Sequence, residues 1–491
     1  MTSNSPSGKA PSPRRAAWAG FIGTALEQYD FVIYGTASAL VFSKLFFPNV
    51  SPAVGILASF STYAVGFAAR PLGGLFFSRY GDRLGRKWVL VMTLLLMGGS
   101  TLAIGFLPTY EHVGLLAPVL LLLCRMAQGL GAGAEQSGGA TLLTETARPG
   151  RRGRTASLVM SGAALGTALG AVAWILVQLL PHDALMSWGW RLVFASSLLV
   201  TVTALVLRRK LRESPVFEEI KEEREDPPAP VKEVFTRGRK PLLLVILMNV
   251  GSNAQSYTFQ VFMASYLITT VGVAEDFPPK ALLLGALCGS AAAFGFGALS
   301  DRVGRRPVYA TIMASLVVLP VPAFLALNTG SALAITLVIC LGFVLPAYGA
   351  VGVQTSYFPE LFGSRYRYAG VTMGREISAV LGGGIAPLVA AALQTAFGGS
   401  WIPIAAYMML VAAISTWAAV RSPETLDRDL TDPRDATDST AALPSLRPGA
   451  DAVPAQPSGA GTRTSGTRTS GTRTSGTGTS GTSTSETRTK A

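Results

Sequence analysis

Twelve long apolar runs limit the architecture that this chain can adopt. A helix that crosses the roughly 30 Å hydrocarbon core of a bilayer needs about 20 mainly apolar residues, and runs of that length recur through most of the sequence. They lack the alternation of barrel strands, and a helix satisfies its backbone hydrogen bonds within the span. We therefore predict an all-α polytopic membrane protein. The twelve predicted transmembrane helices lie at 17–42, 54–77, 88–107, 115–143, 155–180, 190–207, 242–271, 281–299, 308–327, 332–357, 369–396 and 401–420.

The chain is basic, with a formal net charge of +13, but its charge is not distributed as in a nucleic-acid-binding protein. Lys and Arg gather in every second loop between the predicted spans, which is typical of loops on the cytoplasmic side of a membrane. This pattern argues against nucleic acid as a partner. We expect a multi-pass protein of the cell inner (plasma) membrane, surrounded by lipid bilayer, with both termini in the cytoplasm.

Signals of catalytic or cofactor chemistry are missing from the sequence. It has no Walker A motif, no Gly-x-Ser-x-Gly motif and no cluster of metal ligands, and its three cysteines, Cys124, Cys288 and Cys340, fall in separate spans. We therefore expect a protein that is not an enzyme, with no cofactor and no metal site.

An internal repeat divides the chain into two halves of six spans. The sequence "SRYGDRLGRK" at 78–87, after the second span, returns as "GALSDRVGRR" at 297–306, after the eighth. The chain turns polar after the last span and ends in a Gly/Thr/Ser-rich repeat, which cannot bury enough apolar area to fold. The predicted domains are a cytoplasmic tail at 1–15, a six-helix bundle at 16–207, a charged cytoplasmic linker at 208–240, a second six-helix bundle at 241–420 and a disordered cytoplasmic tail at 421–491.

The twelve spans, the six-plus-six repeat and the paired "DRLGRK" and "DRVGRR" loops resemble the major facilitator superfamily of secondary transporters. Further stretches, "EQYDFVIYG", "RPLGG", "WGWRLVF", "ESPVF" and "PELFGSRYRYAG", are similar to its metabolite:proton symporter branch, whose members import proline and betaine, citrate, α-ketoglutarate or shikimate. Gln28 stands where this branch usually has Trp. The resemblance implies a small-molecule substrate and protons as partners, and alternating access between two bundles.

By the same resemblance, the charged loops between helices act as cytoplasmic gates. Glu145 and Arg152 are seven residues apart, and Glu360 and Arg367 repeat that spacing in the second half. The simpler alternative is that these charges only set the topology. The residues to which the resemblance gives a gating role are Asp82, Arg83, Arg86, Asp301, Arg302, Arg305, Glu145, Arg152, Glu360 and Arg367.

Three of the four acidic residues inside the apolar spans are candidates for proton coupling. Glu27 and Asp30 are three residues apart, so they share one face of the first helix near mid-membrane, and Glu135 lies in the fourth span. Ionisable groups in a membrane are costly and mark ion or proton pathways. We predict that at least one of these acids couples a proton to transport. The alternative is a static ion pair with an intramembrane arginine.

Polar and basic residues inside the spans are candidates for contact with a substrate. In the seventh span a polar stripe recurs at helical spacing, and arginine is the planar, bidentate partner of a carboxylate. The alternative is that the polar residues bridge packed helices. Arg70 and Glu376 complete the charged residues within the spans. The predicted substrate-binding residues are Arg125, Gln128, Asn249, Asn253, Tyr257, Gln260 and Arg375.

Together these features predict a proton-coupled secondary active symporter that imports a small organic metabolite, with a mono- or dicarboxylate favoured by the arginines. Three alternatives stay open: a proline/betaine-type osmolyte symporter, a proton-coupled exporter and a solute receptor without net flux. A monomer suffices for alternating access.

Overall fold

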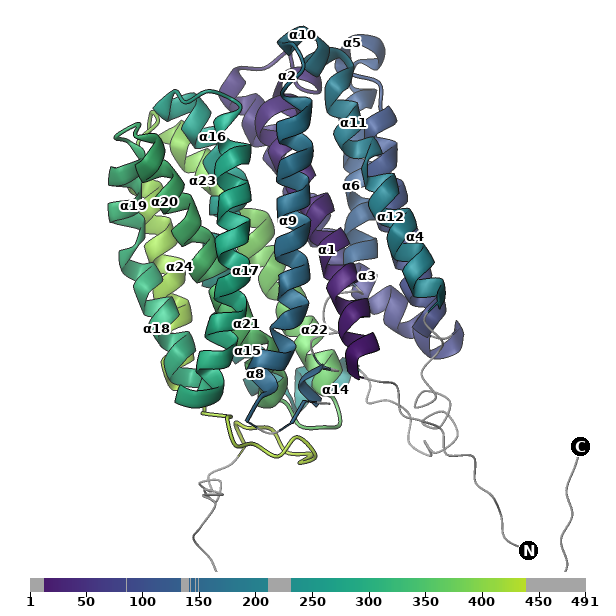
Figure 1. The fold of residues 1–491 in the computed structure, drawn as a ribbon, viewed down its shortest axis with the longest axis vertical. Coiled ribbons are helices and arrows are strands. Elements are labelled where there is room, and N and C mark those ends of the chain that lie inside the picture. The colour runs from purple at the N-terminus through teal and green to yellow at the C-terminus, as the bar shows by residue number, and fades with distance from the viewer. Residues whose placement is uncertain are drawn as a thin grey trace, which may run out of the picture. The chain divides into compact units, whose positions relative to one another are not determined.

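The computed structural model describes residues 13–84, 86–133, 141, 143–145, 147–148, 150–210 and 231–438. All regular elements in these ranges are helical. Figure 1 shows them as two groups of long helices, the first half in purple and blue and the second half in green and yellow. The predicted all-α fold is therefore confirmed for the described part of the chain.

The first half contributes six helical spans, and three of them are interrupted. Their apolar sequences pack α1 against α9 and α6 against both α3 and α4. The elements are α1 (Pro13–Ala37), a π-helical segment (Ser38–Phe42), α2 (Ser43–Leu45), α3 (Pro52–Leu84), α4 (Arg86–Phe106), α5 (Tyr110–Val113), α6 (Leu116–Ala132), α8 (Arg152–Ala156), α9 (Leu158–Val177), α10 (His182–Ala184), a π-helical segment (Leu185–Gly189), α11 (Trp190–Ala195) and α12 (Ser197–Lys210).

The second half repeats this arrangement, with α24 packed against α15 and α18. Its elements are α14 (Val231–Thr236), α15 (Arg239–Tyr257), a π-helical segment (Thr258–Phe262), α16 (Met263–Tyr266), a π-helical segment (Leu267–Val271), α17 (Phe277–Val303), α18 (Arg305–Val318), α19 (Pro320–Leu327), α20 (Ala332–Gly342), a π-helical segment (Phe343–Gly349), α21 (Ala350–Leu361), α22 (Arg367–Ser378), a π-helical segment (Ala379–Gly384), α23 (Ile385–Ala396) and α24 (Ile402–Arg421).

Length and hydropathy account for the membrane spans. Within the described residues, seven helical stretches are long and apolar enough to cross a bilayer, and α18 with α19, bent by 48°, forms an eighth. The remaining four predicted spans are also helical, over α1–α2, α4, α6 and α15–α16. Pro320 stands at the bend between α18 and α19, where a missing backbone donor breaks the helical ladder.

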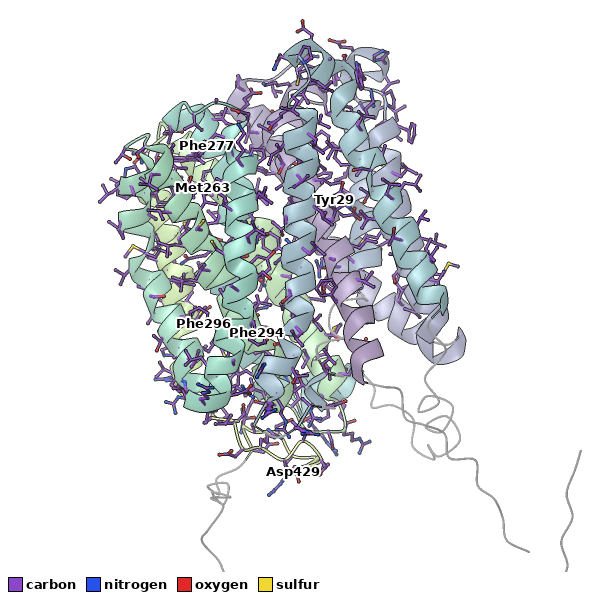
Figure 2. All side chains as sticks on the ribbon, in the orientation of Figure 1. Tyr29, Met263, Phe277, Phe294, Phe296 and Asp429 are labelled. Carbon is purple, nitrogen blue, oxygen red and sulfur yellow. The ribbon has the colours of Figure 1, made fainter. Side chains whose placement is uncertain are left out.

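The two halves meet along two seams. At the first, α9 and α17 run side by side at the centre of Figure 1, and α8 continues this contact against α17 and α21. At the second, α3 packs against α23 and the π-helical segment Ala379–Gly384. Figure 2 labels Phe294 and Phe296 near the end of α17 where Asp429 also lies, and Phe277 at its opposite end. The basic loops gather at the Asp429 end, which is the predicted cytoplasmic side.

Three π-helical segments of the second half border the space between the halves. Gln260, Tyr348 and Ala379 lie on these segments and line a central cavity. The segment that contains Tyr348 also contains Pro346, which cannot donate to the helical ladder. Such one-turn widenings of a helix recur at functional sites.

The prediction of disorder from residue 421 onward is wrong for residues 422–438. This segment packs against the end of α21 and the loop that follows it: the Ala436 N–H donates to the Leu361 carbonyl at 3.0 Å, and the Ser364 N–H donates to the Asp432 carbonyl at 3.0 Å. Its acids and arginines have specific partners, which a compositional argument does not reveal. Residues 439–491 lie outside the described part.

Candidate functional site

A cavity of about 50 Å³ lies between the two halves. A volume of this size holds roughly three to five water molecules, so the cavity must widen before it can take an organic metabolite. Its charged lining residues, among those described, are both arginines. The lining residues are Gln28, Arg70, Met160, Ala163, Asn249, Asn253, Ser256, Tyr257, Gln260, Ala347, Tyr348, Val351, Arg375 and Ala379.

Five of the seven predicted substrate-binding residues line this cavity. They are Asn249, Asn253, Tyr257, Gln260 and Arg375. The helical spacing of the polar stripe is the signal that found the first four, because α15 turns one face toward the other half. The same polar residues also form hydrogen bonds between helices, which is the alternative interpretation of the stripe.

The amides of the stripe are held by neighbouring hydroxyl groups. Nδ2 of Asn249 donates to Oγ of Ser378 at 2.6 Å, and Nε2 of Gln260 donates to Oγ of Ser256 at 2.6 Å. Oδ1 of Asn249 is buried and accepts no hydrogen bond from the described residues. An acceptor left open beside a polar cavity is a position for a water molecule or a substrate donor.

Gln28 is a cavity residue that the sequence did not single out as a ligand. Its Nε2 donates to Oε1 of Gln260 at 2.9 Å, so α1 of the first half and the π-helical segment Thr258–Phe262 of the second are joined above the cavity. The sequence signal that could have identified Gln28 as a cavity residue was its presence where the transporters that this sequence resembles usually have Trp. An amide here provides a donor and an acceptor where Trp would provide bulk and a single donor.

Arg70, on α3, binds two buried acids, Glu27 of its own half and Glu376 of the other half. Its Nε and Nη2 donate to the two carboxylate oxygens of Glu376 at 2.8 and 3.1 Å, and its Nη1 lies 2.9 Å from Oε1 of Glu27. The guanidinium carbon also lies 5.2 Å from the ring centre of Phe31 and 5.3 Å from that of Phe67. Glu27 and Glu376 do not line the cavity, whereas Arg70 does.

Arg125 lies in an aromatic cage and does not line the cavity. Its guanidinium carbon is 4.7 Å from the ring centre of Phe31, 4.1 Å from that of Tyr34 and 4.6 Å from that of Tyr63. One of its nitrogens, Nη1, donates to Oε1 of Gln128. The direct contact of these two residues with a substrate therefore stays a prediction, and the ring faces explain how the cation is stabilised there.

Asp30 is buried close to Arg125, Thr101 and Gln128, and it forms no ion pair with the described residues. Two guanidinium nitrogens of Arg125, Nε and Nη2, lack a hydrogen-bond partner among those residues. Burying a carboxylate without an ion-pair partner is costly. The two acids of the first span are thus in different situations: Glu27 forms an ion pair with Arg70, and Asp30 forms none with the described residues. Glu135 lies outside the described residues.

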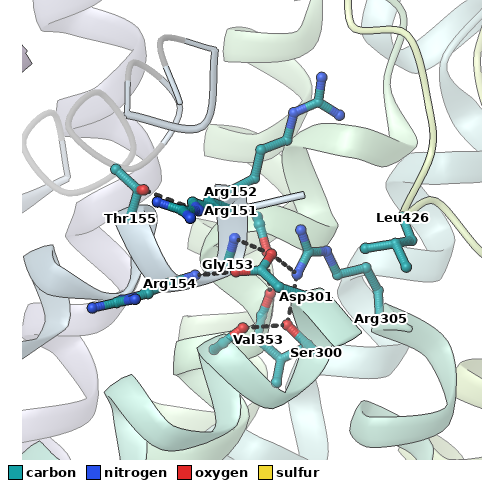
Figure 3. Close-up of polar contacts among 12 residues, drawn as sticks. Arg151, Arg152, Gly153, Arg154, Thr155, Ser300, Asp301, Arg305, Val353 and Leu426 are labelled. Carbon is teal, nitrogen blue, oxygen red and sulfur yellow. Dashed lines mark hydrogen bonds and ion pairs between the residues drawn. The ribbon is translucent and has the colours of Figure 1, made fainter. Parts of the chain in front are cut away.

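Asp301 joins the two halves at the Asp429 end of the first seam (Figure 3). Its Oδ1 accepts from the Gly153 N–H at 2.8 Å, and its Oδ2 accepts from the Arg154 N–H at 2.8 Å, both in the other half. Arg305 holds the same carboxylate, with Nη1 2.8 Å from Oδ1. A carboxylate at the start of α8 also interacts favourably with the helix dipole.

The backbones of the two halves nearly touch at this point. A Cβ built on Gly153 would lie 2.4 Å from the Gly297 carbonyl oxygen, so neither position accommodates a side chain without separating α8 from α17. On the other side of Gly153, Arg154 stacks over the ring of Phe294, with its guanidinium carbon 5.1 Å from the ring centre. The close packing of Gly153 on Gly297 and the hydrogen bonds of Asp301 therefore both hold α8 against α17.

The acids and bases of the repeat pair across the halves. Nη1 of Arg367 lies 2.9 Å from Oε1 of Glu145, and Nη1 of Arg152 lies 3.9 Å from Oε1 of Glu360. Glu360 is also held by Nε of Arg305 at 3.3 Å. Arg302 is exposed at the end of α17. The side chains of Asp82, Arg83 and Arg86 lie outside the described part, so their gating role stays a prediction.

Segment 422–438 adds a further layer to these contacts. The carboxylate of Glu424 accepts from the Arg305 N–H at 2.9 Å and the Arg306 N–H at 3.0 Å, which caps the start of α18. Nη1 of Arg152, from the first half, donates to the Arg428 carbonyl at 2.7 Å. The segment thus binds an arginine that also approaches Glu360.

Polar contacts also join the two halves at the opposite end of the molecule. Nζ of Lys44 lies 3.0 Å from Oε1 of Glu275, and Nε2 of Gln178 donates to the Glu275 carbonyl at 2.8 Å. In each contact the first residue belongs to the first half and Glu275 to the second. Contacts between the halves are therefore present on both sides of the cavity.

Comparison with known proteins identifies the family. The family model for the Major Facilitator Superfamily matches residues 20–375. The chain belongs to the major facilitator superfamily. Its fold agrees: the xylose transporter XylE from Escherichia coli, solved in a partially occluded inward-open conformation, superimposes with a TM-score of 0.66 at 15% identity, over 85% of this chain and 99% of that chain.

Curated relatives in this superfamily are metabolite transporters, which confirms the resemblance to the metabolite symporter branch. The shikimate transporter of Escherichia coli is 36% identical over 412 residues, covering 83% of this chain and 94% of the relative. The proline/betaine transporter of the same organism is 34% identical over 431 residues, covering 85% of each chain. The protein is thus a multi-pass membrane transporter of the major facilitator superfamily, and its relatives are not enzymes.

Proposed function

We propose that this protein is a proton-coupled symporter that imports a small organic acid, a mono- or dicarboxylate, by alternating access. The observation that carries the proposal is the charge of the cavity. Arg70 and Arg375 are the charged side chains that line it in the described part of the chain. A guanidinium binds a carboxylate through two parallel hydrogen bonds, so an organic acid is the ligand that this lining favours.

The uncharged lining narrows the chemistry of the substrate. Gln28, Asn249, Asn253 and Gln260 offer amide donors and acceptors, and Tyr257 offers a hydroxyl group. Groups of this kind recognise hydroxyl or carbonyl oxygens on a substrate. A hydroxylated or oxo acid would use both the arginines and the amides.

Asp30 is the acid that we assign to the proton. Glu27 forms an ion pair with Arg70, whereas Asp30 is buried without an ion-pair partner among the described residues. Protonation removes the cost of holding an unpaired charge away from water. Asp30 would bind a proton from outside, together with the substrate, and release it when the cytoplasmic side opens and water enters.

Alternating access follows from the contacts on the two sides of the cavity. Opening toward the cytoplasm requires loss of the Asp301 contacts and of the Glu145–Arg367 pair. Opening outward requires loss of the contacts of Glu275 with Lys44 and Gln178. Each half would move as a body around the central site.

The expected setting is the inner (plasma) membrane, with both termini cytoplasmic. Arg152, Arg305 and Arg367 support this orientation, because they gather at the Asp429 end of the molecule, where basic residues mark the cytoplasmic side. The cavity is bordered by both halves of one chain, so we propose that the protein transports as a monomer.

A zwitterionic osmolyte is a second candidate substrate. Tyr257 and Tyr348 also line the cavity, and aromatic faces bind quaternary ammonium groups. A betaine-like molecule could place its carboxylate on Arg375 and its ammonium group against these rings.

The test is uptake by the purified protein in proteoliposomes with an imposed inside-alkaline pH gradient. The labelled panel contains shikimate, α-ketoglutarate, citrate, proline and betaine. Accumulation of a carboxylate that collapses with a protonophore is the expected result. Accumulation of proline or betaine alone would favour the osmolyte, outward movement against the gradient an exporter, and binding without accumulation a receptor.

A further inference from the structure

The bridge between Arg70 and Glu376 has the geometry of a carboxylate-binding site that is already occupied. Arg70 lines the cavity, and its Nε and Nη2 hold both oxygens of Glu376 at 2.8 and 3.1 Å. An organic acid in the cavity would bind a guanidinium in the same two-pronged way. The side chain of Glu376 therefore occupies the nitrogens that a substrate carboxylate would use.

We propose that Arg70 anchors the carboxylate of the substrate, and that Glu376 is a resident competitor that the substrate displaces. This inference rests on the proposed function, since it requires a carboxylate as substrate. It makes Arg70 and Glu376 a specificity-determining pair. A neutral molecule cannot replace Glu376 on the guanidinium, because breaking a buried ion pair without a new partner for the cation is strongly unfavourable.

The charge balance of the buried layer is consistent with one proton for each added carboxylate. Three arginines and three acids lie buried there in the described part of the chain, so their formal charges cancel. A bound carboxylate adds one negative charge, and a proton on Asp30 restores neutrality. The six residues are Glu27, Asp30, Arg70, Arg125, Arg375 and Glu376.

After displacement, Glu376 remains close to a second cation. Arg375 precedes it on α22, interacts with it electrostatically and also lines the cavity. The displaced carboxylate therefore keeps a compensating charge beside it. Glu27 stays on Nη1 of Arg70, the nitrogen that Glu376 does not use.

The exchange would also loosen the halves on one side of the site. Arg70 belongs to the first half and Glu376 to the second. At 1.5 Å per residue, Glu376 lies about 14 Å from the cytoplasmic start of α22, whereas Gln260 lies about 30 Å from the start of α15. The Arg70–Glu376 bridge is thus on the cytoplasmic side of the Gln28–Gln260 contact, and its loss favours inward opening with substrate bound.

Equilibrium binding to the purified full-length protein tests this exchange. The probe is labelled shikimate, or α-ketoglutarate or citrate where the wild type accumulates that acid instead, with the methyl ester of the same acid as its uncharged counterpart. Glu376→Gln removes the competing charge and keeps the shape of the side chain. We expect about tenfold tighter binding of the acid and no gain for the ester, since the gain depends on a carboxylate meeting a freed guanidinium.

Two further variants control this result. Glu376→Asp keeps the charge on a shorter side chain, so it should give a smaller gain, and it replaces Glu376→Gln if that variant does not fold. Glu145→Gln removes another ion pair between the halves that is remote from the cavity. If Glu145→Gln acts only by loosening the contact between the halves, it should change the binding of the acid and of the ester by the same factor.

The outcomes separate this proposal from the proposed function. If the wild type accumulates an acid but Glu376→Gln binds it no more tightly, or binds acid and ester equally better, the exchange at Arg70 is wrong and the symporter proposal stands. If the wild type accumulates none of the acids, the proposed function fails and the exchange fails with it.

Discussion

Arg367 of the second half pairs with Glu145 of the first, with Nη1 of the arginine 2.9 Å from Oε1 of the glutamate. The repeat-related residues, Arg152 and Glu360, approach one another in the opposite direction, from the first half to the second. Each half therefore supplies one acid and one base to a pair of contacts between the halves, which we propose close the cytoplasmic side.

Reversing the charges of the Glu145–Arg367 pair should separate its electrostatic role from its packing role. Arg367→Glu places two acids together and removes the donors to the Pro359 and Leu430 carbonyls, and because Arg367 is buried we expect a cost of about 3 kcal/mol, or roughly 100-fold slower uptake. Adding Glu145→Arg should restore the part of the rate that depends on the ion pair. Initial uptake in proteoliposomes measures this, and a double variant as slow as the single one would argue against the pair as a gate.

Asp301→Asn should open the cytoplasmic side more readily. The amide can no longer offer a charge to the N–H groups of Gly153 and Arg154, and hydrogen bonds to a charged group contribute about 1.5–3 kcal/mol. A cysteine introduced by Ala163→Cys reports access to the cavity, in a background without the three native cysteines. We expect roughly tenfold faster alkylation from the cytoplasmic side in inside-out vesicles. Unchanged alkylation would show that Asp301 does not hold the gate.

Two truncations test the segment that follows the last helix. Ending the chain after Arg421 removes the Glu424 cap of α18 and the carbonyl that binds Arg152. Loss of a cap costs about 1 kcal/mol, so a lower apparent melting temperature and slower uptake are expected. Ending the chain after Asp438 keeps the segment and is the matched control. Equal behaviour of the two truncations would mean that the segment contributes nothing.

The docking of this segment should weaken as pH rises. Burial raises the pKa of Asp435, whose oxygens accept from the Gly363 N–H at 2.8 Å and from the Tyr366 hydroxyl at 2.5 Å; Asp438 and Arg428 are the charged neighbours. The pKa of Asp435 in the folded state is above its ordinary value. The stability that Asp435 contributes to the docked segment is therefore fully present below the ordinary pKa, and it is lost as pH rises through the raised pKa.

Limited trypsin cleavage in inside-out vesicles measures this effect. Cleavage within 422–438 relative to an unfolded standard should be faster at pH 8 than near pH 4, the ordinary value from which the pKa of Asp435 is raised. Asp435→Asn should remove the difference, because its amide oxygen can still accept from the Gly363 N–H, its Nδ2 can donate to the Tyr366 hydroxyl oxygen, and an amide does not titrate. A pH response that survives in this variant would have to come from another group.

Hydropathy and periodicity predict most of the fold because lipid imposes a simple rule on each span separately. The polar stripe on α15 is an example: Asn249 and Asn253 reach the cavity because helical spacing fixes a common face. The placement of Arg125 is a counterexample. An intramembrane arginine can be stabilised by an acid or by aromatic rings. The rings that surround Arg125 come from α1 and α3, and residue spacing within the fourth span gives no information about those helices.

Contacts between the halves were the least predictable part of the site. The sequence contains Arg70 and Glu376, 306 residues apart, and nothing in either span indicates that α3 meets α22. The seven-residue spacing likewise suggests local pairs, whereas Glu145 and Glu360 each contact an arginine of the other half. Composition also gave a wrong prediction of disorder for residues 422–438, because the contacts of a few specific acids hold this segment in place.

Coupling between substrate and proton is the central claim, and proton movement driven by substrate tests it most directly. Proteoliposomes with a trapped pH indicator and no imposed gradient receive the accumulated acid, or its methyl ester, from outside. The account predicts that the acid acidifies the lumen in wild-type vesicles. In Asp30→Asn vesicles the proton signal should vanish, while exchange of labelled for unlabelled acid persists. Entry of labelled acid into wild-type vesicles without acidification, or an undiminished proton signal in Asp30→Asn, would contradict it.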